Sequence, residues 1–121
     1  MRPHILFVDD ERTMREVLSN YFTAKGYAVS IAATASEAMA MADGGPIHLV
    51  VMDINLAGEN GLELLKFFKS NFPKLPVIMF TGMTDDGELI EQAMFRGANG
   101  FMRKTESLDD LFAVVKSYAG T

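Results

Sequence analysis

Three acids, a hydroxyl and an amine each follow a short apolar run in this sequence. Asp9 and Asp10 follow ILFV, Asp53 follows VVM, Thr81 follows VIMF, and Lys104 follows GFMR. Carboxylates that lie close together repel one another unless a cation lies between them, and one lysine supplies too little positive charge for three acids. Because the ligands on offer are oxygens, the cation indicated is Mg²⁺. A carboxylate beside a metal ion, a lysine and a hydroxyl is equipped to accept a phosphoryl group.

Each of these residues also has an ordinary explanation when it is considered alone. Asp9 and Asp10 can simply open the following helix, where the helix dipole favours acids. Asp53 can be a helix cap or loop residue, Thr81 a turn residue, and Lys104 a solvated surface charge. The conjunction favours a common site, because each residue directly follows an apolar run and the intervals between the runs are similar.

The elements that would position these residues alternate between strands and helices. Five short apolar runs cover residues 4–8, 27–32, 47–52, 76–80 and 100–103. Helical spacing fills the intervals, with capping pairs at Thr34/Glu37, Asp85/Glu88 and Ser107/Asp110 and glycine stops at Gly26 and Gly97. Runs that are almost wholly apolar are typical of strands covered on both faces. The order predicts a doubly wound (βα)5 three-layer α/β sandwich around a parallel five-stranded sheet.

Chemistry in such open sheets gathers outside the carboxyl ends of the strands. Asp9, Asp10, Asp53, Thr81 and Lys104 all stand at those ends, so the topology predicts that they meet at one edge. A closed barrel of this class needs eight β-α units, and five units therefore favour the open sheet.

Composition limits the classes of function. A length of 121 residues suits one domain over 1–121, and a net charge of −5 makes direct nucleic-acid binding by this domain unfavourable. No apolar stretch approaches the roughly 18 residues of a membrane span. The chain has no cysteine, which fits a reducing compartment, and we expect a cytoplasmic protein without membrane attachment.

The motifs FVDDE, VVMDINLAGENG, VIMFTG and GANGF, with the final lysine, resemble the receiver domain of two-component response regulators, such as the stand-alone chemotaxis regulator. The resemblance covers essentially the whole chain. It implies the flavodoxin-like strand order 2-1-3-4-5. It also implies a signalling domain that catalyses its own phosphorylation and dephosphorylation rather than an enzyme with a separate substrate.

The resemblance also implies roles for the acids. Asp53 would be the phosphoacceptor. Asp10 and Asp53 would ligate Mg²⁺, or Mn²⁺ in its place, and Asp9 would support the ion through water. Asn55, two positions after the acceptor, would offer its backbone carbonyl to the metal.

Four further residues match the family's pattern. Lys104 would bind the phosphoryl group, or pair with Asp53 before phosphorylation. Thr81 would move its hydroxyl onto a phosphoryl oxygen, and Phe101 would then turn inward, which switches the face made by the fourth helix, fifth strand and fifth helix. The ordinary alternative is that Phe101 is a core residue. Gly61 matches the family's glycine in the loop after the acceptor strand.

The implied partners follow from these roles. A phosphohistidine on a sensor histidine kinase or on a histidine phosphotransfer protein would donate the phosphoryl group. A downstream effector domain or protein would then bind the switched face. The resemblance also allows a phosphorylation-dependent homodimer.

Three positions depart from, or qualify, the family's pattern. Ala57 stands where the family usually has proline, so this loop is predicted to be less rigid. Thr105 follows the lysine where many members have a cis proline, and a trans bond is predicted because cis before threonine costs about 3–4 kcal/mol. Met83, two residues after Thr81, cannot orient an attacking water, which predicts that the phosphorylated form is not among the fastest to hydrolyse.

Three other classes remain open on the sequence. One is an interaction module that no longer accepts phosphate. A second is an Mg²⁺-dependent phosphohydrolase, which would require another acid at the position of Asn55. A third is a flavin-binding module, which would require a Ser/Thr/Gly-rich phosphate-binding loop at the position of the acidic segment DDERT. The aromatic residues of the later helices are predicted to be mostly core residues, and they are Phe67, Phe68, Phe72 and Phe95.

Overall fold

In the computed structural model, which describes residues 2–56, 59–82 and 87–120, five parallel strands form one sheet. The strands are β1 (His4–Val8), β2 (Ala28–Ala32), β3 (Leu49–Met52), β6 (Val77–Thr81) and β7 (Gly100–Arg103). Their order across the sheet is β2-β1-β3-β6-β7. The predicted order 2-1-3-4-5 is thereby confirmed, with β6 and β7 as the fourth and fifth strands of this sheet.

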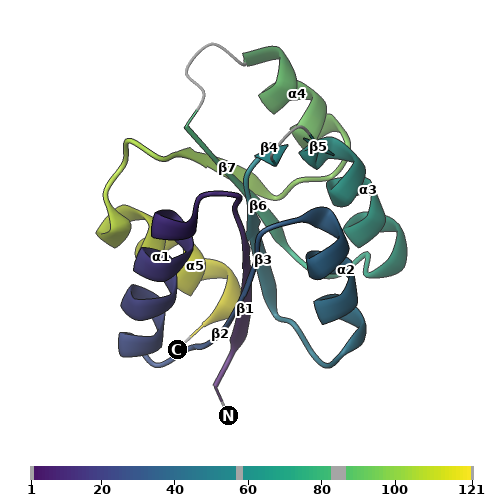
Figure 1. Ribbon diagram of the computed structural model, residues 1–121. Coiled ribbons are helices and arrows are strands. Elements are labelled where there is room, and N and C mark those ends of the chain that lie inside the picture. The colour runs from purple at the N-terminus through teal and green to yellow at the C-terminus, as the bar shows by residue number, and fades with distance from the viewer. Residues whose placement is uncertain (1, 57–58, 83–86, 121) are drawn as a thin grey trace.

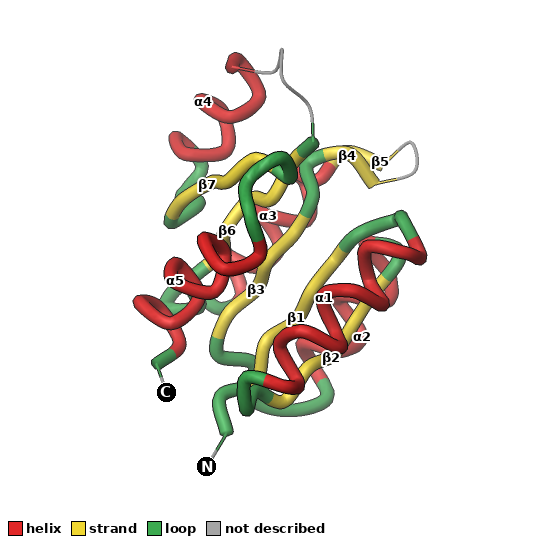
Figure 2. Tube along the Cα trace, turned by 90° about the vertical axis from the view of Figure 1, so that its left-hand side faces the viewer, coloured by secondary structure: helices red, strands yellow, loops and turns green. Residues whose placement is uncertain are grey.

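Helices cover both faces of the sheet and complete the three layers (Figure 1, Figure 2). They are α1 (Arg12–Ala24), α2 (Ala35–Asp43), α3 (Gly61–Asn71), α4 (Gly87–Phe95) and α5 (Leu108–Ala119). α1 and α5 lie on one face, and α2, α3 and α4 lie on the other. The doubly wound sandwich predicted from the sequence is therefore confirmed.

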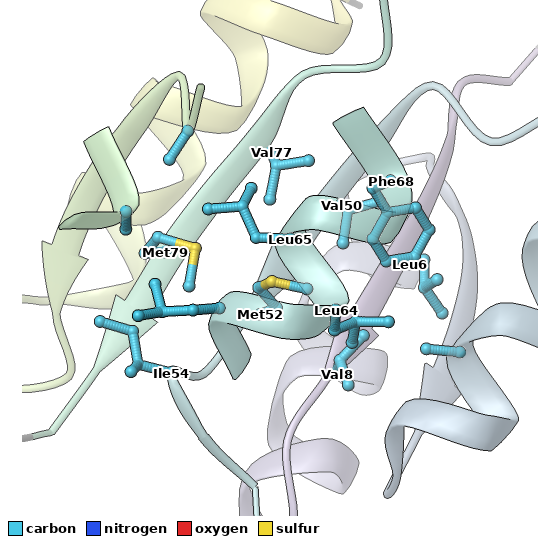
Figure 3. Packing of buried hydrophobic residues seen from close by; sticks show 14 of the residues in the cluster. Leu6, Val8, Val50, Met52, Ile54, Leu64, Leu65, Phe68, Val77 and Met79 are labelled. Carbon is cyan, nitrogen blue, oxygen red and sulfur yellow. The ribbon is translucent and has the colours of Figure 1, made fainter. Parts of the chain in front are cut away.

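Neighbouring residues of each central strand belong to different cores. Ile5 and Phe7 of β1 pack in the cluster beneath α1 and α5, whereas Leu6 and Val8 pack in the cluster beneath α2, α3 and α4. Figure 3 shows this second cluster, where strand residues such as Leu6 and Val8 lie with Phe68 of α3. The same alternation holds along β3 and β6. It explains why these runs are apolar at every position, because neither face of a central strand meets water.

Local capping interactions set the helix starts. The Thr34 hydroxyl accepts a hydrogen bond from the Glu37 N–H at 3.2 Å, and the Ser107 hydroxyl accepts one from the Asp110 N–H at 3.1 Å. Both predicted capping pairs are confirmed. The third pair involves Asp85, which lies outside the described residues.

The expectation that most of these aromatic residues are core residues is confirmed, and Phe95 is the exception. Phe68 is fully buried, and Phe67 and Phe72 pack against the core, but Phe95 is 92% exposed. The helical spacing of α4 explains the difference. The inward residues of α4 are Ile90 and Ala93, and Phe95 follows Ala93 by two positions, which places it about 200° around the helix axis.

The loop after β3 holds an element that the sequence reading did not predict. β4 (Asn55–Leu56) pairs with β5 (Glu59–Asn60) in an antiparallel hairpin. Ala57, where a less rigid loop was predicted, lies outside the described residues. The hairpin returns the chain to the end of β3, where α3 begins.

Gly61 occupies the close contact that this return creates. Its N–H donates a hydrogen bond to the Ile54 carbonyl at 2.6 Å. A Cβ at Gly61 would lie 2.5 Å from the Ile54 carbonyl oxygen and 2.7 Å from that of Asp53. Glycine is therefore required at this position by the approach of two backbone segments.

Two remaining expectations concern the backbone and membranes. No cis peptide bond occurs in the described parts of the chain, so the Lys104–Thr105 bond is trans as predicted. Within the same residues, no helix combines the length and apolar character that crossing a membrane needs.

Replacing Gly61 with alanine tests this contact. We expect Gly61→Ala to lower the free energy of unfolding by about 1–3 kcal/mol, because the added methyl group forces two backbone segments apart. Gly87→Ala is the matched control, since nothing lies within 4 Å of a Cβ there. It should leave stability unchanged or raise it by up to about 1 kcal/mol. Urea unfolding measures both variants, and equal stabilities would contradict the explanation.

Candidate functional site

The parallel register of the sheet brings the acids together. Val8 of β1 pairs with Met52 of β3, so the residues that follow them, Asp9 and Asp53, leave the sheet side by side. The Asp53 N–H continues the ladder by donating to the Val8 carbonyl at 3.0 Å. One carboxylate oxygen from each of Asp9, Asp10 and Asp53 lies within 4.8 Å of the others. Asp9 and Asp53 are buried and Asp10 is exposed, so the cluster opens to solvent on one side.

Lys104 extends from the end of β7 into this cluster. Its Nζ lies 2.7 Å from Asp9 Oδ2, 2.8 Å from Asp53 Oδ2 and 3.2 Å from Glu11 Oε1. The Lys104 side chain is only 10% exposed. Three carboxylates therefore contact a single ammonium group, and the Asp10 carboxylate lies close to two of them, which leaves an excess of negative charge.

Burial and ion pairing act in opposite directions on these groups. Burial raises the pKa of the Asp9 carboxyl, although the hydrogen bond from Lys104 and the Glu11 N–H both oppose that rise. Burial would lower the pKa of Lys104, but its hydrogen bonds to Asp53 and Asp9 outweigh this and raise the pKa. Lys104 is thus fully charged at neutral pH. A further cation near Asp9 would stabilise the ionised form of its carboxyl group.

Backbone donors fix the direction of two carboxylates. Asp53 Oδ1 accepts a hydrogen bond from the Asn55 N–H at 3.1 Å, and Asp9 Oδ1 accepts one from the Glu11 N–H at 2.9 Å. Arg15 Nη1 donates to the Asp9 carbonyl at 2.8 Å. These hydrogen bonds restrict the rotation of the Asp9 and Asp53 carboxylates. The Oδ2 atom of each carboxylate faces Lys104 Nζ.

The two residues expected to switch lie on neighbouring strands. Thr81 ends β6 and is fully buried, and its carbonyl accepts the Lys104 N–H at 2.8 Å. Phe101 of β7 pairs with Met79 of β6 and is 43% exposed. The alternative that Phe101 is a core residue is therefore wrong. Met83 lies outside the described residues.

Sequence reasoning missed two residues of this site. Glu11 was quoted only as part of a motif, and Arg15 was not considered. Glu11 follows Asp9 and Asp10 directly, so a third acid in that run was the available signal. Arg15 had no signal of its own, because its partner is a backbone carbonyl.

The donor set fits Mg²⁺. This ion binds oxygens at about 2.1 Å, so opposite ligands lie about 4.2 Å apart. Carboxylate oxygens that lie within 4.8 Å of one another are compatible with a shared ion of this size. Exposed Asp10 gives a route for the ion, and the excess of carboxylates over Lys104 favours it. Asp10, Asp53 and Asp9 are the side chains available to hold such an ion.

Comparison with known proteins gives a consistent result. Residues 5–116 match the family model of the response regulator receiver domain. The TorCAD operon transcriptional regulatory protein TorR of Escherichia coli (strain K12) is 32% identical over 117 residues, which are 97% of this chain and 50% of that protein. The transcriptional regulatory protein FixJ of Bradyrhizobium diazoefficiens is 32% identical over 114 residues, 94% of this chain and 55% of that protein. The chain thus spans about half the length of these curated relatives.

Solved structures agree with the sequence matches. A CheY-like response regulator receiver domain protein from Methanospirillum hungatei JF-1 superposes with a TM-score of 0.91 at 30% identity, over 97% of this chain and 93% of that one. The receiver domain of NtrX from Brucella abortus gives a TM-score of 0.89 at 34% identity, over 97% and 98% of the two chains. With three acids and a lysine gathered at the carboxyl edge of a 2-1-3-4-5 sheet, this chain belongs to the response regulator receiver domain family of two-component systems.

Proposed function

We propose that this chain is a phosphoacceptor domain that takes a phosphoryl group from a phosphohistidine onto Asp53. The observation that carries the proposal is the 2.8 Å contact between Lys104 Nζ and Asp53 Oδ2 inside a cluster of acids. A buried ammonium group that already touches the acceptor carboxylate is placed to contact the oxygens of a phosphoryl group attached there. The proposal treats residues 1–121 as a single receiver domain.

The chemistry needs little beyond positioning. An Asp53 oxygen forms the new P–O bond as the P–N bond of the donor breaks, and the imidazole nitrogen keeps the electron pair. The hydrogen bond from the Asn55 N–H holds Asp53 in one orientation for this attack. Lys104 donates to the transferring oxygens, where negative charge is concentrated.

A divalent ion completes the charge balance. Asp10 and Asp53 would ligate Mg²⁺ directly, Asp9 through water, and Asn55 through its backbone carbonyl, and Mn²⁺ has the same oxygen preference. When bound, the ion neutralises charge on the phosphoryl oxygens. Burial raises the pKa of the Asp9 carboxyl, so a divalent ion nearby would stabilise the ionised form of Asp9.

The proposed output is a change in the face formed by α4, β7 and α5. The Thr81 hydroxyl follows the phosphoryl oxygens, and Phe101 moves from its 43% exposed position toward the space that Thr81 leaves. A sensor histidine kinase or a histidine phosphotransfer protein would be the donor. An effector domain or protein, or a second phosphorylated copy, would bind the altered face.

One alternative keeps the fold and loses the chemistry. A receiver that only binds partners needs no phosphoacceptor, and the retention of Asp53, Lys104 and the acids around them favours phosphorylation instead. The family match gives no support to the phosphohydrolase or to the flavin-binding module.

Phosphorylation by a small donor tests the proposal. With Mg²⁺ and acetyl phosphate, intact-protein mass spectrometry should show a gain of one phosphoryl group as acetate leaves. The gain should vanish in Asp53→Asn and after chelation of the metal, and it should persist in the control Asp43→Asn at the exposed end of α2. Absence of a mass gain in the unmodified chain would favour the interaction module.

Lys104→Met tests the role of the ammonium group. We expect the phosphorylation rate constant to fall roughly 100-fold, because removal of one preorganised donor to a transferring group typically has this effect. Stopped reactions followed by mass spectrometry give the rate. An unchanged rate would show that Lys104 only neutralises the resting acids.

Thr81→Ala separates phosphorylation from switching. The variant should still gain a phosphoryl group, since Thr81 forms no bond in the transfer. Amide NMR shifts of α4, β7 and α5 should then change much less on phosphorylation than in the unmodified protein. Shift changes of the same size in both proteins would remove Thr81 from the switch.

A further inference from the structure

The ammonium group of Lys104 has a third partner, Glu11, to which the function proposed above gives no role. An ammonium group has three N–H donors. Asp9, Asp53 and Glu11 lie at 2.7, 2.8 and 3.2 Å from Lys104 Nζ, so these carboxylates match the whole donor set. A phosphoryl group that approaches the Asp53 carboxylate therefore has to displace one of them before Lys104 can donate to it.

Glu11 is the partner that is easiest to displace. Its contact is the longest, and its side chain is 64% exposed, against 3% for Asp9 and 8% for Asp53. An exposed carboxylate regains water when it leaves an ion pair, whereas a buried one is left as an unpaired charge. The exchange on Lys104 should therefore occur at Glu11.

The backbone of Glu11 can stay in place while its side chain moves. Its N–H donates to Asp9 Oδ1, and its carbonyl accepts the Arg15 N–H at 3.1 Å in the first turn of α1. Glu11 is the N-cap residue of α1, yet its side chain makes no capping hydrogen bond. The carboxylate thus contributes to Lys104 and not to the helix start.

We propose that Glu11 is a positioning residue that occupies one N–H of Lys104 in the resting state and releases it to the incoming phosphoryl group. The inference rests on the proposed phosphorylation of Asp53. Its consequence is that the Glu11 carboxylate competes with an anionic phosphodonor for Lys104. Removing that charge while keeping the shape of the side chain should accelerate phosphorylation.

The first experiment compares two variants that each lose one negative charge from the same segment. With acetyl phosphate at saturating Mg²⁺, Glu11→Gln should raise the second-order rate constant about two- to fivefold, the factor that an exposed ion pair represents. Glu16→Gln is the control, because Glu16 pairs with Arg12 at 3.1 Å on the surface of α1. A Glu11→Gln rate no higher than that of the control would overturn the inference.

The second experiment asks whether Glu11 acts through Lys104. Glu11→Gln should give no acceleration when Lys104 is already methionine, and full acceleration in that background would refute the assignment. In the unphosphorylated protein, NMR should show faster hydrogen exchange of the Lys104 ammonium protons in Glu11→Gln than in Glu16→Gln, and equal exchange would also refute it. Because the exchange measurement needs no phosphorylation, it separates a failure of this inference from a failure of the proposed function.

Discussion

The confinement of one ammonium group among several carboxylates is the interaction on which the site depends. Lys104 is nearly buried and contacts Asp9 and Asp53 at 2.7 and 2.8 Å, and both acids are buried as well. A buried ion pair is stabilising only when its geometry is good and its remaining hydrogen bonds are made. Here the N–H groups of Asn55 and Glu11 supply those hydrogen bonds. The resting site is therefore ordered yet still deficient in positive charge, which favours the binding of a divalent ion. In the proposed function, that ion would offset the negative charge of the phosphoryl group.

The rest of the fold serves this arrangement through backbone geometry. The strands that carry the acids and the lysine are held in register by parallel ladders, and some ladders continue one residue past the strand ends. The β4–β5 hairpin returns the chain after Asp53, and the absence of a side chain at Gly61 lets α3 start against the backbone of Asp53 and Ile54. Both features decide where the Asp53 carboxylate lies.

Much of this arrangement could be predicted from the sequence, because its causes are local or topological. Wholly apolar runs identify central strands, and the parallel direction of those strands brings Asp9, Asp53 and Lys104 to one edge. The distances could not be predicted, and neither could the part played by Glu11, since the contact of that side chain with Lys104 joins residues 93 positions apart. Phe95, the one exception among the four aromatic residues expected to be mostly core, is exposed because of its angular position on α4, which the residue type does not reveal. The short hairpin after Asp53 was missed because strands of two residues carry too little periodicity.

The two cores on opposite faces of the sheet carry a further consequence. Along β1, odd-numbered residues serve one core and even-numbered residues serve the other. If β1 shifted by one position against β3, Ile5 and Phe7 would enter the core that Leu6 and Val8 fill, and the reverse. Both faces of the strand are buried, so the displaced side chains could not move into solvent. The same shift would carry Asp9 out of line with Asp53. A chain with this shifted register would therefore lose the pairing of Asp9 with Asp53 as well as its native packing. The alignment of β1 against β3 thus determines both the cores and the arrangement of the acids.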